Sequence, residues 1–171
     1  LCVEGATIAL NADGVDVDAI RFERLVSEGT PEGLGQAVEL YRGDLLDGLT
    51  LQEPPFEEWL MAERERLREL ALEALAGLLA FQRAAGAADA ALQTGLRLSA
   101  LDPLQEPVHR TLMRLYAQLG RRGSALHQYQ VCVSVLQREL GVEPEEETKH
   151  LYQEILRRRP AVTTTPQTVT S

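Results

Sequence analysis

The chain has 171 residues, 44% of them apolar and 25% charged, which is ordinary for a globular protein and enough for the core of one or two domains. Its 17 basic and 26 acidic residues give a net charge of −9, which argues against a general phosphate-binding surface. Nothing approaches the roughly 18 consecutive apolar residues of a membrane span, and no basic-then-apolar signal segment opens the chain, so we predict a cytoplasmic protein without membrane partners.

The first 17 residues have the pattern of β-structure. Residues 3–10 alternate and favour a strand, and the Asn-Ala-Asp-Gly run at 11–14 has turn chemistry. We predict a small β-hairpin here, or its second half. Because the chain opens on Leu1 in what reads as the middle of a strand, we expect a fragment of a longer protein.

Two short helices follow. We expect the first to be capped by Asp16 or Asp18 and to end at Gly29, with apolar members Ile20, Phe22, Leu25 and Val26. The run Thr-Pro-Glu at 30–32 then gives a cap, a proline at the first helical position and an acid in the first turn. This second helix is expected to continue to Gly43.

A loop over residues 41–56 precedes the longest predicted helix. Two glycines and two prolines interrupt any helical pattern in the loop, whereas residues 55–85 show sustained apolar periodicity with interleaved Glu and Arg outside. The only tryptophan, Trp59, is interpreted as an apolar anchor for the loop rather than as a ligand platform.

The remaining helices contain a pattern written twice about 34 residues apart, the period of a tetratricopeptide helix pair. The matched positions are Leu78 and Leu112, Gly86 and Gly120, Ala91 and Ala125, and Leu92 and Leu126. Because one pair cannot bury its apolar face alone, we predict an all-α, right-handed tetratricopeptide-like array of stacked antiparallel helix pairs, with the β-hairpin at its N-terminus. The alternative is an antiparallel helical bundle without a true repeat.

The predicted helices of this part run over residues 87–100 and 107–119, then from the second turn to Gly141, and finally from Glu143 to the arginines at 157–159. Cys132 falls on an apolar helix face and is expected in the core, and it is too far from Cys2 in sequence to suggest a disulfide framework. The uncharged, Thr-rich residues 160–171 have the composition of a linker.

No chemical motif points to catalysis. There is no phosphate-cradling glycine loop with a following lysine, and the only lysine is Lys149 in the acidic last helix. His109, His127 and His150 fall on three different predicted helices with no partner at metal-ligand spacing. We therefore predict no enzyme, no cofactor and no metal site.

Four short stretches have a more specific character: YRGDLL at 41–46, FEEW at 56–59, LDP at 101–103 and ELGVEP at 139–144. In this order they resemble the bacterial transcriptional activator domain of SARP-type regulators, over roughly residues 16–159. The resemblance implies three parts: residues 1–17 as the last hairpin of an OmpR-like winged helix, 18–159 as the helical domain, and 160–171 as a flexible linker.

The resemblance also implies a function. Such a domain is a regulatory protein-interaction domain of a transcription activator, which positions a DNA-binding module and contacts RNA polymerase, a neighbouring domain or a second protomer. DNA would be bound through the missing N-terminal domain of the parent protein and not through this fragment. The alternative is a tetratricopeptide-like scaffold or peptide-binding module unrelated to transcription.

A partner-binding surface is predicted from the polar residues of the first helix in each pair. Once the apolar positions are buried, these helices leave Arg83, Arg110, Arg114 and Gln118. Together they would form a basic stripe for the carboxylates of a partner. In the alternative interpretation Arg110 pairs with acids such as Glu106, and Arg114 is solvated.

Overall fold

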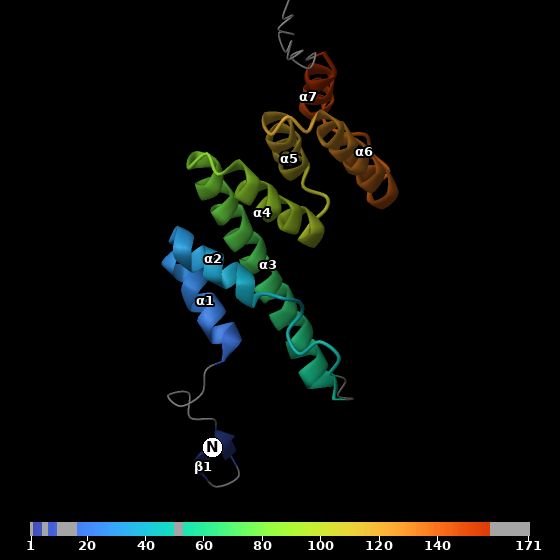
Figure 1. Cartoon of the computed structure of the whole chain (residues 1–171). Coiled ribbons are helices and arrows are strands. Elements are labelled where there is room, and N and C mark those ends of the chain that lie inside the picture. Colours follow the sequence, from blue (N-terminus) through green and yellow to red (C-terminus); the bar gives the residue numbers. More distant parts are fainter. Residues whose placement is uncertain (1, 5–6, 10–16, 50–52, 158–171) are drawn as a thin grey trace, which may run out of the picture. The chain divides into compact units, whose positions relative to one another are not determined.

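The computed structural model describes residues 2–4, 7–9, 17–49 and 53–157 (Figure 1). The chain divides into two compact units, residues 1–102 and residues 103–171. The described helices make the protein all-α in its main body, as predicted.

Two three-residue strands lie near the N-terminus. β1 (Cys2–Glu4) pairs antiparallel with β2 (Thr7–Ala9), with Cys2 opposite Ala9. The strands thus fall at residues 2–4 and 7–9, whereas the sequence analysis placed strand-favouring residues over 3–10 ahead of a turn at 11–14. The predicted turn at 11–14 lies outside the described residues, as does the predicted linker at 160–171.

The first unit contains four helices. They are α1 (Asp18–Glu28), α2 (Pro31–Leu40), α3 (Pro54–Ala84) and α4 (Ala88–Leu101). The side chain of Thr30 accepts a hydrogen bond from the Gly33 amide at 3.0 Å, so the predicted start of α2 is confirmed. A core of Phe22, Leu25, Ala37, Leu67 and Ala71 joins α1, α2 and α3.

Three expectations about this unit are wrong. The residue at the cap of α1 is Val17, and Asp18 instead accepts a hydrogen bond from the adjacent Ala19 amide. Ile20 is 60% exposed, because the buried face of α1 is carried by Phe22 and Leu25. Trp59 is 51% exposed and contacts Phe56 with a ring-centroid distance of 5.6 Å, so it is a surface aromatic and not a core anchor.

The second unit contains α5 (Glu106–Gln118), α6 (Arg122–Glu139) and α7 (Glu146–Arg157). Met113, Ala125, Leu151 and Ile155 form a core cluster in which all three helices meet. Cys132 is fully buried, as expected. The last helix begins at Glu146 rather than at Glu143.

The repeated sequence pattern produces the same turn twice, between α3 and α4 and between α5 and α6. Gly86 and Gly120 adopt left-handed φ angles of 70° and 73°. The turn bonds also match: the Ala87 amide donates to the Gln82 carbonyl at 2.9 Å, and the Arg121 amide donates to the Tyr116 carbonyl at 2.8 Å. The tetratricopeptide-like stacking of the two pairs stays a prediction.

Within the described residues, no helix is both long enough and apolar enough to cross a bilayer.

Candidate functional site

The loop between α2 and α3, residues 41–49, shapes two open grooves on the first unit. Arg64 of α3 fixes this connecting loop, because its Nε donates to the Leu45 carbonyl at 2.8 Å and its Nη2 donates to the Leu46 carbonyl at 3.0 Å. Leu46 has a φ of 53°, a left-handed conformation that a leucine rarely adopts. The YRGDLL stretch is thus a fixed loop attached to a long helix.

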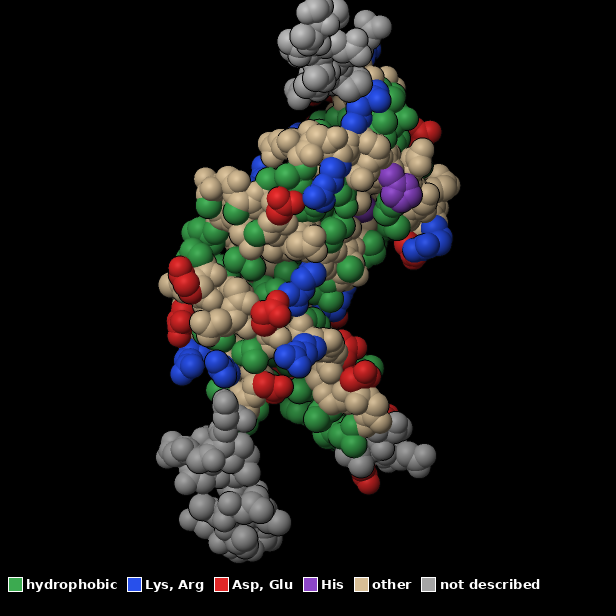
Figure 2. Space-filling model, viewed as in Figure 1, with side chains coloured by type: hydrophobic (Ala, Val, Ile, Leu, Met, Phe, Trp, Pro, Cys, Tyr) green, Lys and Arg blue, Asp and Glu red, His purple; other side chains and the backbone are tan. Residues whose placement is uncertain are grey.

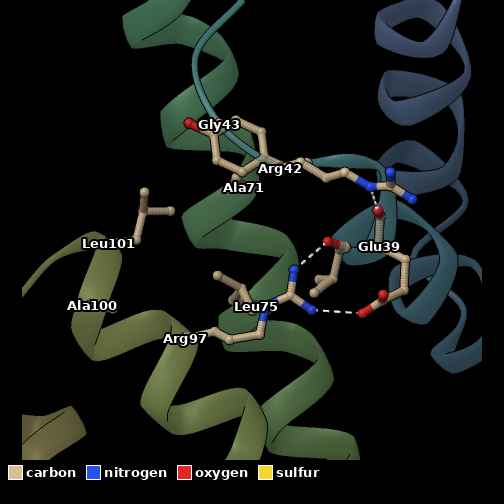
Figure 3. A pocket seen from close by; sticks show the side chains of 10 residues that line it. Glu39, Arg42, Gly43, Ala71, Leu75, Arg97, Ala100 and Leu101 are labelled. Atoms are coloured by element: carbon tan, nitrogen blue, oxygen red, sulfur yellow. Dashed lines mark hydrogen bonds and ion pairs between the residues drawn. The ribbon is translucent and has the colours of Figure 1, made fainter.

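The first groove, which we call the α2–α4 groove, has a volume of about 480 Å³. Its apolar part consists of Ala71 and Leu75 from α3 together with Ala100 and Leu101 from α4 (Figure 3). Its polar rim consists of Glu39, Tyr41, Arg42 and Arg97.

Arg97 connects the two sides of this groove. Its guanidinium donates from Nη1 to the Glu39 carboxylate at 2.6 Å and from Nη2 to the Val38 carbonyl at 2.6 Å (Figure 3). A cation at the carbonyl end of a helix is favoured by the helix dipole. Arg97 therefore links α4 to α2 at the rim of the groove, and 43% of its side chain remains exposed.

Tyr41 lies between the groove and the core of the unit. Its ring centroid is 5.9 Å from that of Phe22. Burial, and then the nearby Asp44 carboxylate, raise the pKa of the Tyr41 phenol. Like an ordinary tyrosine, Tyr41 is protonated at neutral pH, so its hydroxyl can donate a hydrogen bond.

The second groove, which we call the α1–loop groove, lies where the connecting loop faces α1 and has a volume of about 390 Å³. Tyr41, Arg42 and Gly43 line both grooves. The rim of the α1–loop groove is acidic, with Asp18, Asp44 and Asp47, whereas the rim of the α2–α4 groove is rich in arginine.

In the second unit, a polar network is buried where α5 meets the start of α7. The Glu106 carboxylate accepts from the Glu145 amide at 2.9 Å and from the Thr148 hydroxyl at 2.7 Å. Arg110 donates to the Glu145 carboxylate at 2.7 Å and to the Thr148 hydroxyl at 2.9 Å. Glu106 and Arg110 are each less than a tenth exposed, so the network replaces water for both charges.

The same network holds the residue before α7, because the amide of Glu145 donates to the Glu106 carboxylate. The later start of the helix has a local reason: a residue before proline disfavours helical backbone, and Glu143 precedes Pro144. The sequence spacing of Glu106 and Arg110 reveals their proximity on one helix. It does not reveal partners 35 to 42 residues away.

The structure separates the four predicted partner-binding residues. Arg110 is buried, so its inclusion in an exposed stripe is wrong, and its predicted pairing with Glu106 is observed at 3.9 Å. Arg114 and Gln118 are exposed and line a cavity of about 230 Å³ between α5 and α7. Arg114 is also paired, with Glu147 at 3.2 Å.

Arg83 is exposed on α3 and belongs to the other unit. A partner-binding role for Arg83, Arg114 and Gln118 stays a prediction. The sequence analysis missed Arg64 and Arg97, whose carbonyl partners lie 18 to 59 residues away and leave no local signature.

The three histidines differ in burial. His109 is buried, with Nε2 2.9 Å from the Pro103 carbonyl and Nδ1 2.7 Å from the Gln128 amide nitrogen. His127 and His150 are exposed. Across the part of the chain that the structure describes, no group of His, Cys, Asp or Glu could hold a metal ion.

The grooves combine aliphatic floors with a few fixed charges, which is the chemistry of a surface that binds a protein segment. The first unit thus presents two open grooves of this kind on a helical body. The chain belongs to the bacterial transcriptional activator domain family, whose model matches residues 17–156. A comparison with curated proteins gave no match.

Proposed function

We propose that this domain is the regulatory part of a SARP-type transcription activator, in which it positions a DNA-binding module and contacts RNA polymerase or a second protomer. The family match over residues 17–156 carries the proposal. Residues 1–17 are then the last hairpin of an OmpR-like winged helix, and the protein works in the cytoplasm.

The connecting loop supports a protein-binding role. The YRGDLL stretch, on which the resemblance to this family rests in part, lines both grooves of the first unit and is held by Arg64. The matched turns at Gly86 and Gly120 support a tetratricopeptide-like, right-handed stack of the helix pairs.

DNA is the partner of the preceding module and not of this chain. On the face shown in Figure 2, basic and acidic side chains are interspersed rather than gathered by sign. With a net charge of −9, we expect no duplex binding by the 171-residue chain at physiological salt. A mobility shift with submicromolar affinity at that salt contradicts this expectation.

The contact with RNA polymerase is tested by tethering. The 171-residue chain is fused to an unrelated DNA-binding module and placed upstream of a test promoter in bacteria, with the unfused module as the control. We expect reporter transcription to rise. An unchanged reporter, with the fusion folded and bound to its operator, favours the alternative of a scaffold or peptide-binding module unrelated to transcription.

A further inference from the structure

We infer that the α1–loop groove binds a basic, apolar segment of a protein partner, one that presents a leucine-like side chain flanked by arginine or lysine. The inference rests on the proposed function, because it names the chemistry of a partner for the same domain. Three features of the groove carry it: its floor, its rim and the conformation of Leu46.

The floor of the groove is apolar and continuous with the core. Phe22 and Leu67 belong to the core cluster of the first unit, and Leu40 and Leu45 pack against that cluster. A volume of about 390 Å³ lies within the range of roughly 300–1,000 Å³ typical of ligand pockets. The floor can therefore accept apolar side chains of a partner without rearranging the unit.

The rim selects a cation. Asp18, Asp44 and Asp47 are all exposed and line the groove with one cation, Arg42, so these four side chains carry a net charge of −2 at neutral pH. Such a rim attracts arginine or lysine side chains, and it repels a phosphate backbone or an anionic lipid surface.

Leu46 places an apolar side chain at the lip of the groove. It is 45% exposed although its φ of 53° is a left-handed conformation that is unfavourable for a leucine. Packing inside the unit offsets little of this cost, because nearly half of the residue remains in solvent. A partner that covers Leu46 gains apolar burial at a residue that is already held in place by Arg64.

The α2–α4 groove serves as an internal comparison. It shares Tyr41, Arg42 and Gly43 with the α1–loop groove, but its rim has Arg42 and Arg97 against the single acid Glu39. A basic segment is therefore favoured on one side of the connecting loop and disfavoured on the other.

The test uses a synthetic hexapeptide, acetyl-Arg-Leu-Arg-Leu-Leu-Arg-amide, added to the 171-residue chain and followed by NMR shifts of backbone amides. We expect shifts concentrated in α1 and the connecting loop, with binding that weakens as salt rises from about 50 to about 300 mM. Peptides with Glu for Arg, or with Gly for Leu, should bind at least about fivefold more weakly.

Protein variants identify the groove. Asp44→Asn with Asp47→Asn should weaken hexapeptide binding by at least about fivefold, and the matched pair Glu57→Gln with Glu58→Gln, which removes the same charge from α3, should not. Leu46→Gly should weaken binding without lowering the melting temperature, because glycine tolerates the left-handed φ. A loss of binding that followed only the melting temperature would contradict a docking role.

Equal binding by the two double variants, or shifts that map elsewhere, overturns the inference. The outcome is independent of the reporter test. Reporter activation without hexapeptide binding removes this inference and leaves the proposed function, whereas binding without activation removes the contact with RNA polymerase and leaves a basic-segment groove.

Discussion

The α3–α4 and α5–α6 helix pairs share one turn but differ in what they bury. Ala91 and Ala125 occupy matching positions, and both are fully buried. Between α3 and α4 the buried residues are almost all apolar, and Thr94 is the one buried polar residue described in the first unit. The second unit buries Glu106, His109, Arg110, Thr111, Gln128 and Thr148.

The two units differ in buried polar residues because the α5–α6 pair fixes a further helix, α7, through buried charged side chains. In the second unit α7 is fixed at both ends by charges that complement its dipole: Glu106 engages the amide before its first turn, and Arg122 donates to the carbonyls of Ile155 and Leu156 at 3.0 and 2.7 Å. In the first unit Arg68 and Arg97 donate to carbonyls at helix ends, and Arg97 lies at the rim of the α2–α4 groove. The same type of helix pair thus supports either an open groove or an internal polar clamp, our name for the buried network of Glu106, Arg110, Glu145 and Thr148.

The largest expected effect comes from breaking the internal clamp. Arg110→Ala leaves the Glu106 carboxylate buried without its cation, which costs about 3–5 kcal/mol of unfolding free energy in comparable buried pairs. Urea melts measure the loss, and hydrogen exchange should show α7 opening first. The rim variant Arg97→Ala should cost less than about 1 kcal/mol. If the two variants lost equal amounts of unfolding free energy, the buried clamp would be no more important for stability than the exposed rim.

Cys132 reports opening of the second unit without a substitution near the clamp. Burial raises the pKa of its thiol from 9.0 to about 11, so the thiolate fraction at pH 8 falls about 100-fold. Because the folded pKa is raised, the stability contributed by this group is fully present below pH 9 and is lost as pH rises through about 11.

Thiol-reagent kinetics, measured in a Cys2→Ser background, should therefore be at least about 100-fold slower for native Cys132 than for an unfolded control. The rate should rise in Arg110→Ala, because that variant opens the second unit. Rapid labelling of the native protein at pH 8 would show that the second unit opens more readily than its buried network implies.

Overpacking tests whether the two helix crossings are equivalent. Ala91→Trp and Ala125→Trp should each cost about 1–3 kcal/mol or more, because both alanines are fully buried. The neighbouring exposed positions provide controls as Ala90→Trp and Ser124→Trp. Differential scanning calorimetry follows the losses. If a variant at a buried alanine were as stable as its exposed control, the helices at that crossing would not be closely packed.

The turn glycines test the equivalence more finely. No heavy atom lies within 4 Å of an added Cβ at Gly86 or Gly120, so alanine there introduces backbone strain alone. At φ values of 70° and 73° the expected cost is about 1–2 kcal/mol at each site. Gly123→Ala, inside α6 with equal space, should instead stabilise by up to about 1 kcal/mol. Unequal losses in chemical denaturation would mean that the two turns differ.

The sequence predicted the parts of this fold that depend on local spacing. Apolar periodicity, Gly29, Thr30 and the repeated glycines locate the helices to within a few residues because each acts over one helical turn. The same reasoning misplaced Trp59, because periodicity does not tell which part of a long helix extends beyond its neighbours. The bond between Glu106 and the amide of Glu145 was missed because the two residues lie 39 positions apart in sequence.

The candidate site was less predictable for the same reason. The grooves arise where the connecting loop meets three helices, and Arg64 fixes that loop through carbonyl oxygens, which every residue possesses. No residue type at the accepting position signals such a bond. The predicted basic stripe failed for a different reason. The residue types identified Arg110 and Arg114 as cations, but the sequence did not show that Arg110 is buried and Arg114 exposed.

The smallest expected effect separates those two arginines. Arg114→Ala removes only an exposed pair with Glu147, so the unfolding free energy should change by less than about 1 kcal/mol, against the much larger loss for Arg110→Ala. Combined with Gln118→Ala in the promoter-tethered fusion, it also tests the cavity between α5 and α7 as a partner surface. The matched control is Arg138→Ala, which removes another exposed cation from the same unit.

If reporter activity falls for Arg114→Ala with Gln118→Ala while the melt and the Arg138→Ala control stay unchanged, the pair contacts a partner. Unchanged activity removes this surface and leaves the grooves of the first unit as the candidate contacts. A lowered melt would instead assign Arg114 to the clamp, because its partner Glu147 also lies 3.3 Å from Arg110. In that case the polar network of the second unit extends from the buried α5–α7 contact to the surface, and the contrast between an internal clamp and an exposed rim holds only for the first unit.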